Sequence, residues 1–351
     1  MSGGRPAEGL VTTAPREDTP DGGPVLAVEG LRVHFTGESG VARAVDGVDV
    51  TVGRRETVCL VGESGCGKTV SALAVLGLVP GPPEGLAAGR IRFGGRNLLE
   101  LDDRAMETVR GRRIGMVFQE PLTSLNPVFT IGEQIAEPLR VHLRLPEPEV
   151  HRRCIQLLAD VGLDSPADRL ADYPHRLSGG QRQRVMIAMA LACEPELIIA
   201  DEPTTALDVT VQAQILALMR RLQQSRGMSM LYITHDLRVV AQIADRVYVM
   251  YAGLIAECGD LDQIFKAPRH PYTRALLAAL PGRGKRGRRL YSIPGTVPDP
   301  AHRPAGCPFH PRCPQAVAPC RTQLPGLCAF EPGHVARCPV AAERGPEDWC
   351  A

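Results

Sequence analysis

The eight residues from Gly62 to Thr69, GESGCGKT, constrain the fold of this chain more than any other segment. They match the pattern G-x-x-x-x-G-K-[ST], whose glycines let successive backbone N–H groups turn inward around a phosphate. A short apolar run, ETVCLVG, leads into the loop, and TVSALAVLGL continues from it with the length and composition of a helix. This order of strand, loop and helix weighs against a chance glycine-rich turn. It predicts a nucleotide phosphate site in an α/β fold.

The loop supplies charge as well as backbone donors. Lys68 places a cation beside the β- and γ-phosphates, and the Thr69 hydroxyl can ligate Mg²⁺ at the positive end of the following helix. Cys66 occupies a free position of the pattern, and we expect it to act as a spacer rather than a redox switch. The predicted phosphate-binding residues are Gly62, Glu63, Ser64, Gly65, Cys66, Gly67, Lys68 and Thr69.

An acidic pair ends a second apolar run, LIIADEP. Asp201 can bind the Mg²⁺ through water, and Glu202 can polarise an attacking water, because phosphoryl transfer needs a metal anchor and a water-orienting base. Without the upstream phosphate loop, such a pair is better read as a solvated turn. With that loop, the two acids predict hydrolysis of a bound nucleoside triphosphate.

Length and charge limit the other possibilities. A chain of 351 residues has room for one large domain and a smaller appendage. Forty basic and 39 acidic residues give a net charge of +1, which does not favour nucleic acid or an anionic membrane as the main partner. The first residues lack the apolar segment of a secretory signal, and the longest uncharged stretch, Thr69 to Pro83, is too short to span a bilayer. We therefore expect a cytosolic protein without a transmembrane helix.

Hydrophobic periodicity predicts the domain organisation. VLAVEGLRVHF and ARAVDGVDVTV alternate as antiparallel strands do, whereas ELIIAD and SMLYITH are compact runs separated by a helical segment, as in a parallel sheet. We expect a mobile leader over residues 1–25 and a main domain over residues 26–265. This domain has the α/β core of a P-loop NTPase with a parallel sheet, an antiparallel β subdomain, and an inserted α-helical subdomain at about residues 121–180. A Cys-rich C-terminal extension occupies residues 266–351.

The motif LSGGQ, Leu177 to Gln181, precedes the acidic pair and opens a long helical segment. In this order with the phosphate loop, it resembles the nucleotide-binding subunits of ABC transporters, which use ATP and Mg²⁺. The resemblance implies that LSGGQ donates to the γ-phosphate of ATP held by the opposite subunit, across a dimer interface. The signature residues it assigns to this role are Ser178, Gly179, Gly180 and Gln181.

The same resemblance assigns four further residues by their order and spacing. Gln119 in MVFQEP corresponds to the glutamine that senses Mg²⁺ and water, and His235 in YITHD corresponds to the histidine that contacts the γ-phosphate. Asp208 in ALD corresponds to an aspartate at the dimer interface. Phe35 lies where the family keeps an aromatic residue that stacks on adenine, although an ordinary core phenylalanine is about as common there.

Three longer segments resemble one group within that family, the ATPase subunits of oligopeptide and dipeptide importers, a group that includes nickel importers. They are VFQEPLTSLNPVFTIGEQI from Val117, HPYTRALLAALP from His270, and the IPG…GCPFHPRCP pattern within Ile293 to Pro314. The resemblance implies import of di- or oligopeptides, with nickel or another small solute as the alternative and a soluble ABC ATPase as a more distant one.

It also implies the partners and the location. They are a second, paralogous ABC ATPase subunit, two transmembrane permease subunits, and indirectly an extracytoplasmic substrate-binding protein, with no nucleic acid. The chain then lies peripherally on the cytoplasmic face of the cell membrane.

Six of the eleven cysteines fall in the last 45 residues. Four of them, Cys307, Cys313, Cys320 and Cys338, have wider spacings than the short C-x₂₋₄-C pairs of zinc ribbons. Four thiolates in a cytosolic, Pro-rich segment can hold a [4Fe–4S] cluster, and members of the peptide-importer group resemble this arrangement. We expect such a cluster, with Zn²⁺ and unligated cysteines as the alternatives. Cys328 and Cys350 lie outside the pattern.

Overall fold

The computed structural model describes residues 23–37, 40–120, 124–205, 207–280 and 291–343. Most of the expected leader therefore lies outside the described residues. The central element of the described part is a sheet with the strand order β11-β12-β10-β9-β3-β8-β7-β6. Strands β9, β3, β8, β7 and β6 run parallel, and β10, β12 and β11 continue the sheet antiparallel. Their bounds are β3 (Thr57–Val61), β6 (Ile114–Val117), β7 (Leu197–Asp201), β8 (Ser229–Thr234), β9 (Arg246–Tyr251), β10 (Leu254–Asp260), β11 (Cys328–Glu331) and β12 (His334–Ala336).

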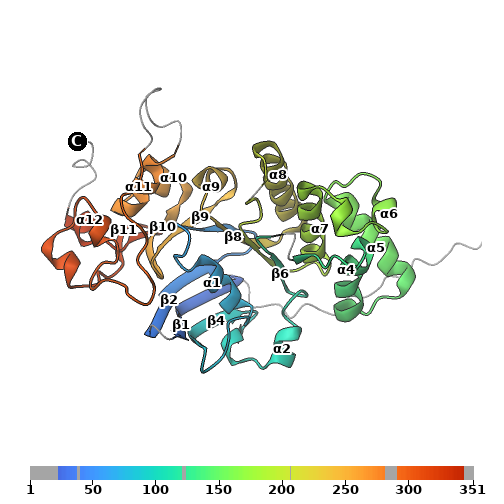
Figure 1. Ribbon diagram of the computed structural model, residues 1–351, viewed down its shortest axis with the longest axis horizontal. Coiled ribbons are helices and arrows are strands. Elements are labelled where there is room, and N and C mark those ends of the chain that lie inside the picture. Colours follow the sequence, from blue (N-terminus) through green and yellow to red (C-terminus); the bar gives the residue numbers. More distant parts are fainter. Residues whose placement is uncertain (1–22, 38–39, 121–123, 206, 281–290, 344–351) are drawn as a thin grey trace, which may run out of the picture.

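A second, antiparallel sheet has the order β2-β1-β4-β5 (Figure 1). It consists of β1 (Leu26–Gly37), β2 (Gly40–Val52), β4 (Gly85–Phe93) and β5 (Arg96–Asn97). The long pair β1 and β2 is the one that the alternating sequence pattern predicts. The α/β fold with its parallel sheet and antiparallel β subdomain is thereby confirmed.

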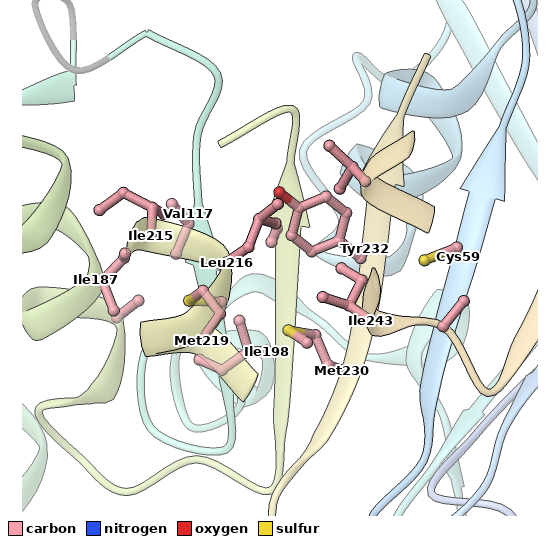
Figure 2. Packing of buried hydrophobic residues seen from close by; sticks show 14 of the residues in the cluster. Cys59, Val117, Ile187, Ile198, Ile215, Leu216, Met219, Met230, Tyr232 and Ile243 are labelled. Atoms are coloured by element: carbon pink, nitrogen blue, oxygen red, sulfur yellow. The ribbon is translucent and has the colours of Figure 1, made fainter. Parts of the chain in front are cut away.

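Alternation along the parallel strands creates two cores, one on each face of the central sheet. On β3, Cys59 and Val61 belong to one core, whereas Val58 and Leu60 belong to the other. The first core lies between the sheet and the helices, and Figure 2 shows Tyr232 and Met230 of β8 in it beside Leu216 and Met219 of α8. The second core joins the sheet to the antiparallel subdomain and to α1. Burial on both faces explains why these strands read as continuous apolar runs.

Helices gather at one end of the molecule, opposite the C-terminal residues (Figure 1). This group consists of α4 (Ile131–Pro138), η2 (Leu139–Leu143), α5 (Glu147–Asp160), α6 (Pro166–Arg169), η3 (Pro174–Arg176) and α7 (Gly179–Leu191). The other helices are α1 (Lys68–Val75), η1 (Leu98–Glu100), α2 (Asp103–Glu107), α8 (Val209–Arg226), α9 (Leu237–Ile243), α10 (Leu261–Lys266), α11 (Pro271–Ala278), η4 (His310–Arg312), η5 (Ala318–Arg321) and α12 (Pro339–Glu343). In the described part of the chain, none of them is long and apolar enough to cross a membrane.

The C-terminal residues continue the central sheet, which their sequence does not predict. Strand β12 pairs with β10, and β11 pairs with β12, although this stretch has little hydrophobic periodicity. The expected division between residues 26–265 and 266–351 therefore separates strands that are hydrogen-bonded neighbours. That division stays a prediction about sequence units.

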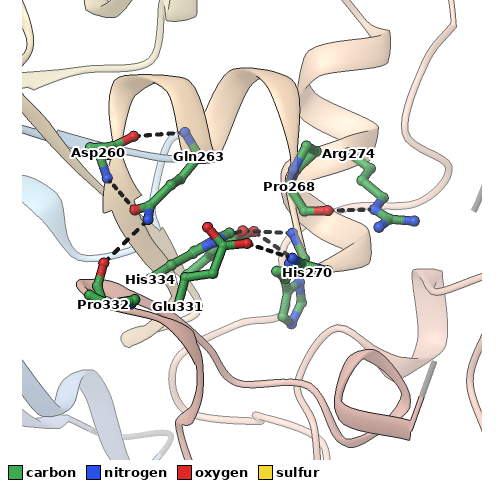
Figure 3. Close-up of polar contacts among 10 residues, drawn as sticks. Asp260, Gln263, Pro268, His270, Arg274, Glu331, Pro332 and His334 are labelled. Atoms are coloured by element: carbon green, nitrogen blue, oxygen red, sulfur yellow. Dashed lines mark hydrogen bonds and ion pairs between the residues drawn. The ribbon is translucent and has the colours of Figure 1, made fainter. Parts of the chain in front are cut away.

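A buried carboxylate joins these C-terminal strands to the rest of the fold. Glu257 on β10 is fully buried and accepts hydrogen bonds from the backbone N–H groups of Arg269 and His270, at 2.6 and 2.9 Å. Its Oε1 also lies 2.8 Å from Nε2 of His334 on β12. Figure 3 shows His270 and His334 converging here, with Glu331 nearby. One carboxylate thus holds three segments together.

We predict that Glu257→Ala destabilises the protein by about 3–5 kcal/mol, because it leaves two backbone donors and a buried histidine without their partner. Chemical denaturation of the full chain measures this loss. The matched control is Glu331→Ala, which removes a half-exposed carboxylate paired with Arg269 and should cost at most about 1 kcal/mol. Equal losses in the two variants would contradict the structural role of Glu257.

Candidate functional site

The phosphate loop connects the end of β3 to the first residue of α1 (Lys68–Val75), in the middle of the central sheet. Two of its glycines pack so closely that no side chain fits. A Cβ on Gly62 would lie 2.2 Å from the carbonyl oxygen of Met250, and one on Gly67 would lie 2.3 Å from that of Ala44. Gly67 also has a φ of 105°, which disfavours any other residue. The backbone of the loop is therefore pressed against β9 and β2.

Lys68 is buried within this loop. Its Nζ donates to the carbonyl oxygens of Gly62 and Glu63, at 2.8 and 3.1 Å. Both carbonyls belong to the loop itself, so the ammonium group stabilises a turned backbone while it stays beside the cavity. A phosphate oxygen can take the place of these carbonyls as a partner for the same charge.

Glu202, directly after β7, is a hub for polar side chains from three other positions. Its carboxylate lies 3.0 Å from Nδ1 of His235 and accepts from Thr205 Oγ1 at 2.9 Å and from Gln119 Nε2 at 3.3 Å. Glu202 has a φ of 45°, an unfavourable conformation for a residue with a Cβ. Such strain is typical of functional sites, where surrounding contacts fix the backbone.

Asp201, the last residue of β7, is buried and has one oxygen, Oδ1, without a hydrogen-bond partner. Burial raises the pKa of this carboxyl, and the adjacent Glu202 carboxylate adds to the shift, while a hydrogen bond from Thr69 opposes it. A buried acid with a free oxygen beside a threonine hydroxyl has the donor set that Mg²⁺ binds. The residues present therefore fit a magnesium ion between the loop and β7.

These groups surround one cavity of about 700 Å³. Of the residues predicted from sequence, it is lined by Gly62, Glu63, Ser64, Gly65, Gly67, Lys68, Thr69, Gln119, Glu202 and His235. Further residues that line the cavity are not predicted by the sequence, namely Ala44, Val70, Thr205, Leu276 and Pro300. Thr205 follows the acidic pair closely and could have been found from it. Leu276 lies within the HPYTRALLAALP segment and Pro300 within Ile293 to Pro314, but nothing local in either segment indicates that it reaches the cavity.

The other predicted residues lie outside this cavity. The Ser178 hydroxyl caps α7 by accepting from the Gln181 backbone, and Asp208 caps α8 by accepting from Val211. A Cβ on Gly180 would meet Val211 at 2.7 Å, which places the signature motif against the start of α8. Cys66 is buried beneath the loop, and Phe35 packs against the second core. The chain alone therefore brings together the loop, Gln119, Glu202 and His235, but not the signature motif.

The four cysteines of the predicted cluster share a second, small cavity. Cys307, Cys313, Cys320 and Cys338 all line it, together with His270 and His310, and all four are free thiols. Burial raises the pKa of Cys307 and of Cys313 to about 11. Among the described residues, however, no group of three or more histidines, cysteines or acids is arranged to hold a metal ion.

Comparison with known proteins assigns the class. The ABC transporter family model matches residues 45–205, and the model of the oligopeptide/dipeptide transporter C-terminal region matches residues 256–320. A probable peptide ABC transporter ATP-binding protein, y4tR of Sinorhizobium fredii, is 51% identical over 90% of this chain and 94% of its own length. The dipeptide transport ATP-binding protein DppD of Escherichia coli is 49% identical over 90% of this chain and 96% of its own length.

Solved structures agree with this assignment. The ATP-binding cassette MJ0796, in a dimer bound to ADP and Pi, has a TM-score of 0.60 with this chain at 28% identity, over 67% of this chain and 98% of its own. CbiO1 of Clostridium perfringens is part of an ABC transporter complex. It has a TM-score of 0.60 with this chain at 27% identity, over 70% of this chain and 92% of its own. The chain belongs to the ATP-binding subunits of ABC transporters, which couple ATP hydrolysis to transport. Within that class, it carries the C-terminal region of the oligopeptide/dipeptide group.

We predict that Glu202→Gln keeps ATP binding and lowers turnover by about 10²–10⁴-fold, the range expected when a general base is lost. ATP hydrolysis by the assembled transporter measures this effect. Lys68→Ala should instead weaken nucleotide binding itself, because it removes the charge that faces the phosphates. Glu196→Gln is the matched control, since Glu196 pairs with Arg113 away from the cavity and its loss should leave turnover unchanged. Near-normal turnover in Glu202→Gln would contradict the assignment.

Proposed function

We propose that this chain hydrolyses ATP in the 700 Å³ cavity and thereby energises import of dipeptides or oligopeptides. The observation that carries the proposal is the polar hub on Glu202, which joins Gln119, Thr205 and His235 beside the phosphate loop. The peptide substrate is supported by relatives named for peptide and dipeptide transport, which match nearly their full length. Nickel or another small solute is the competing cargo.

Residue roles in the ATP site follow from the positions of the donors. The loop amides and Lys68 bind the β- and γ-phosphates at the N-terminus of α1. Thr69 and Asp201, with Gln119 near, would hold Mg²⁺, which when bound would supply the positive charge that phosphoryl transfer requires. The free Oδ1 of Asp201 supports this placement, because a buried acceptor needs a partner.

Glu202 acts as the base for the attacking water. Its hydrogen bonds from Thr205 and Gln119 fix the carboxylate, and His235, which is about half exposed, stays within reach of the terminal phosphate. A water between the Glu202 carboxylate and the phosphate would be oriented for attack while its proton passes to the carboxylate. Different exposure supports different roles for the two acids, Asp201 as a Mg²⁺ ligand and Glu202 as the base. Of the two, only Glu202 lines the cavity.

A second ATPase subunit completes the site. The signature residues Ser178, Gly179, Gly180 and Gln181 lie outside this chain's cavity, so we propose that they meet ATP held by a paralogous partner, with Asp208 at the same interface. Gly180 packs against Val211, three residues after Asp208, which supports a common surface for the two motifs. Phe35 is proposed to stack on adenine, since it lies on β1 opposite Ala42, two residues before the cavity-lining Ala44.

Exposed apolar residues support docking to two permease subunits on the cytoplasmic face of the membrane. Phe118 adjoins Gln119, and Val128 and Phe129 precede α4, with exposed fractions of 41%, 72% and 49%. Val141 adds a fourth exposed apolar side chain in the helical region. Large apolar side chains that are exposed to water close to the site favour a protein interface. Through these permeases the chain would act with an extracytoplasmic binding protein.

The four cysteines are proposed to ligate a [4Fe–4S] cluster. They converge on one cavity as free thiols, in a segment with little hydrophobic core of its own. Thiolates of such a cluster bind four separate irons and so lie farther apart than thiolates that share one zinc ion. The raised thiol pKa values mean that binding must release protons.

Reconstitution of the purified transporter tests the peptide assignment. We expect ATP-dependent uptake of a labelled dipeptide into vesicles, and no uptake when this chain carries Glu202→Gln. Uptake of Ni²⁺ in place of peptide would contradict the proposed cargo while leaving the ATPase intact.

The subunit composition of the same complex tests the pairing. We expect one copy of this chain and one of a related ATPase for each pair of permeases. Ser178→Arg should then block hydrolysis at the partner's phosphate loop and leave nucleotide affinity of this chain almost unchanged. Two copies of this chain without a second ATPase would contradict the heterodimer.

Anaerobic purification tests the cluster. We expect a brown protein with broad absorbance near ~400 nm and about four irons per chain, as for a Cys₄ cubane. Cys313→Ser should reduce the iron content, whereas Cys258→Ser, which changes a buried cysteine on β10, should not. Stoichiometric zinc or a colourless anaerobic protein would overturn the cluster.

A further inference from the structure

A paired hydrogen bond connects the Cys-rich extension to the phosphate loop. Arg312 donates from Nη1 and Nη2 to the two carboxylate oxygens of Glu63, at 2.7 and 2.9 Å. Its side chain is only 5% exposed, and the two residues are 249 positions apart. Bidentate pairs of this kind fix both distance and orientation. The contact therefore restrains the second residue of the loop from the far end of the chain.

Neither partner of this contact is free to move. The guanidinium of Arg312 also donates to the carbonyl oxygen of Pro294 at 2.7 Å and to the Tyr251 hydroxyl at 3.2 Å. The backbone N–H of Glu63 donates to the Tyr272 hydroxyl on α11, at 2.9 Å. Both the backbone and the side chain of Glu63 are thus held by residues from the C-terminal quarter of the chain.

Aromatic packing fixes the segment that carries Arg312. Phe309 packs on Tyr251 and on Tyr272, with ring centroids 5.2 and 5.3 Å apart, and the two tyrosines pack on each other at 4.6 Å. Those same tyrosines supply the hydroxyl groups described above. The rings therefore form a rigid base beneath the phosphate loop.

Two cysteines bracket this segment. Cys307 and Cys313 lie on either side of Phe309 and of η4, which ends at Arg312, and both line the cysteine cavity. The segment from 307 to 313 thus has both ends in that cavity, and Arg312, directly before Cys313, binds Glu63. The segment therefore connects the cysteine cavity to the phosphate loop.

We propose that Arg312 is a positioning residue of the ATP site, which holds the phosphate loop in its binding conformation through Glu63. A loop that is ordered before ATP arrives loses less conformational entropy on binding, so affinity rises. The loop holds the phosphates in both ground state and transition state, which means that the contact contributes mainly to binding and only weakly to the chemical step. This inference rests on the proposed ATP site.

ATP affinity of the full chain tests the proposal. Arg312→Gln should raise the Kd for ATP about tenfold, a ratio that corresponds to about 1.4 kcal/mol. In the assembled transporter KM should rise by a similar factor, with kcat within about twofold of wild type. Arg312→Lys keeps the charge but loses the paired geometry. Its Kd for ATP should therefore lie between the Kd of the wild-type chain and that of Arg312→Gln.

A double-mutant cycle separates positioning from other effects. Glu63→Gln should raise the Kd about as much as Arg312→Gln, and the double variant should be no weaker than either single variant. Glu63→Gln also serves if Arg312→Gln does not fold. If the double variant instead raises the Kd for ATP by the product of the two single increases, the proposal is wrong.

Arg269→Gln is the matched control. Arg269 has a comparably buried side chain and pairs with Glu331, but it touches neither the loop nor the ATP cavity. Its loss should lower the free energy of unfolding and leave the Kd unchanged. If Arg312→Gln also lowers the free energy of unfolding and leaves the Kd for ATP unchanged, Arg312 only stabilises the C-terminal extension and the proposal is wrong. If the wild-type chain itself binds no ATP, the proposed function fails instead.

Discussion

The close approach of the phosphate loop to two neighbouring strands is the constraint on which the rest of the site depends. Gly62 lies against the backbone of Met250 on β9, and Gly67 lies against that of Ala44 on β2. Since β3 is buried on both faces, the loop has a fixed origin at the centre of the sheet. The parallel order β3-β8-β7-β6 then brings Gln119, Glu202 and His235 to the same edge, because each directly follows a strand or lies within two residues of its end.

Polar contacts across this edge bring Gln119, Glu202 and His235 together around one cavity, which the signature motif does not line. Glu202 adopts an unfavourable φ and is restrained by its three side-chain partners, as expected where strain is maintained for function. The signature motif lies outside the cavity, against the start of α8. In the proposed cycle, in which ATP joins two subunits and hydrolysis separates them, this motif would meet the γ-phosphate of ATP held by the partner subunit.

The sequence predicts the parts of the fold and site that depend on local pattern. Period-two alternation identified β1 and β2, compact apolar runs identified β7 and β8, and the phosphate motif located the cavity. It did not predict β11 and β12, because their pairing with β10 joins segments with weak periodicity. It also missed Pro300 and Leu276 in the cavity and the contact between Arg312 and Glu63, since such long-range contacts leave no local signal.

A structure of the assembled transporter with ATP bound is the most direct test of the proposed ATP site. We expect the phosphates against the amides of residues 62–69, with Lys68 Nζ moved from the carbonyls of Gly62 and Glu63 to a phosphate oxygen. Glu63 should still accept both hydrogen bonds from Arg312. ATP bound elsewhere, or Lys68 still on the two carbonyls with the phosphates outside the loop, would contradict the account.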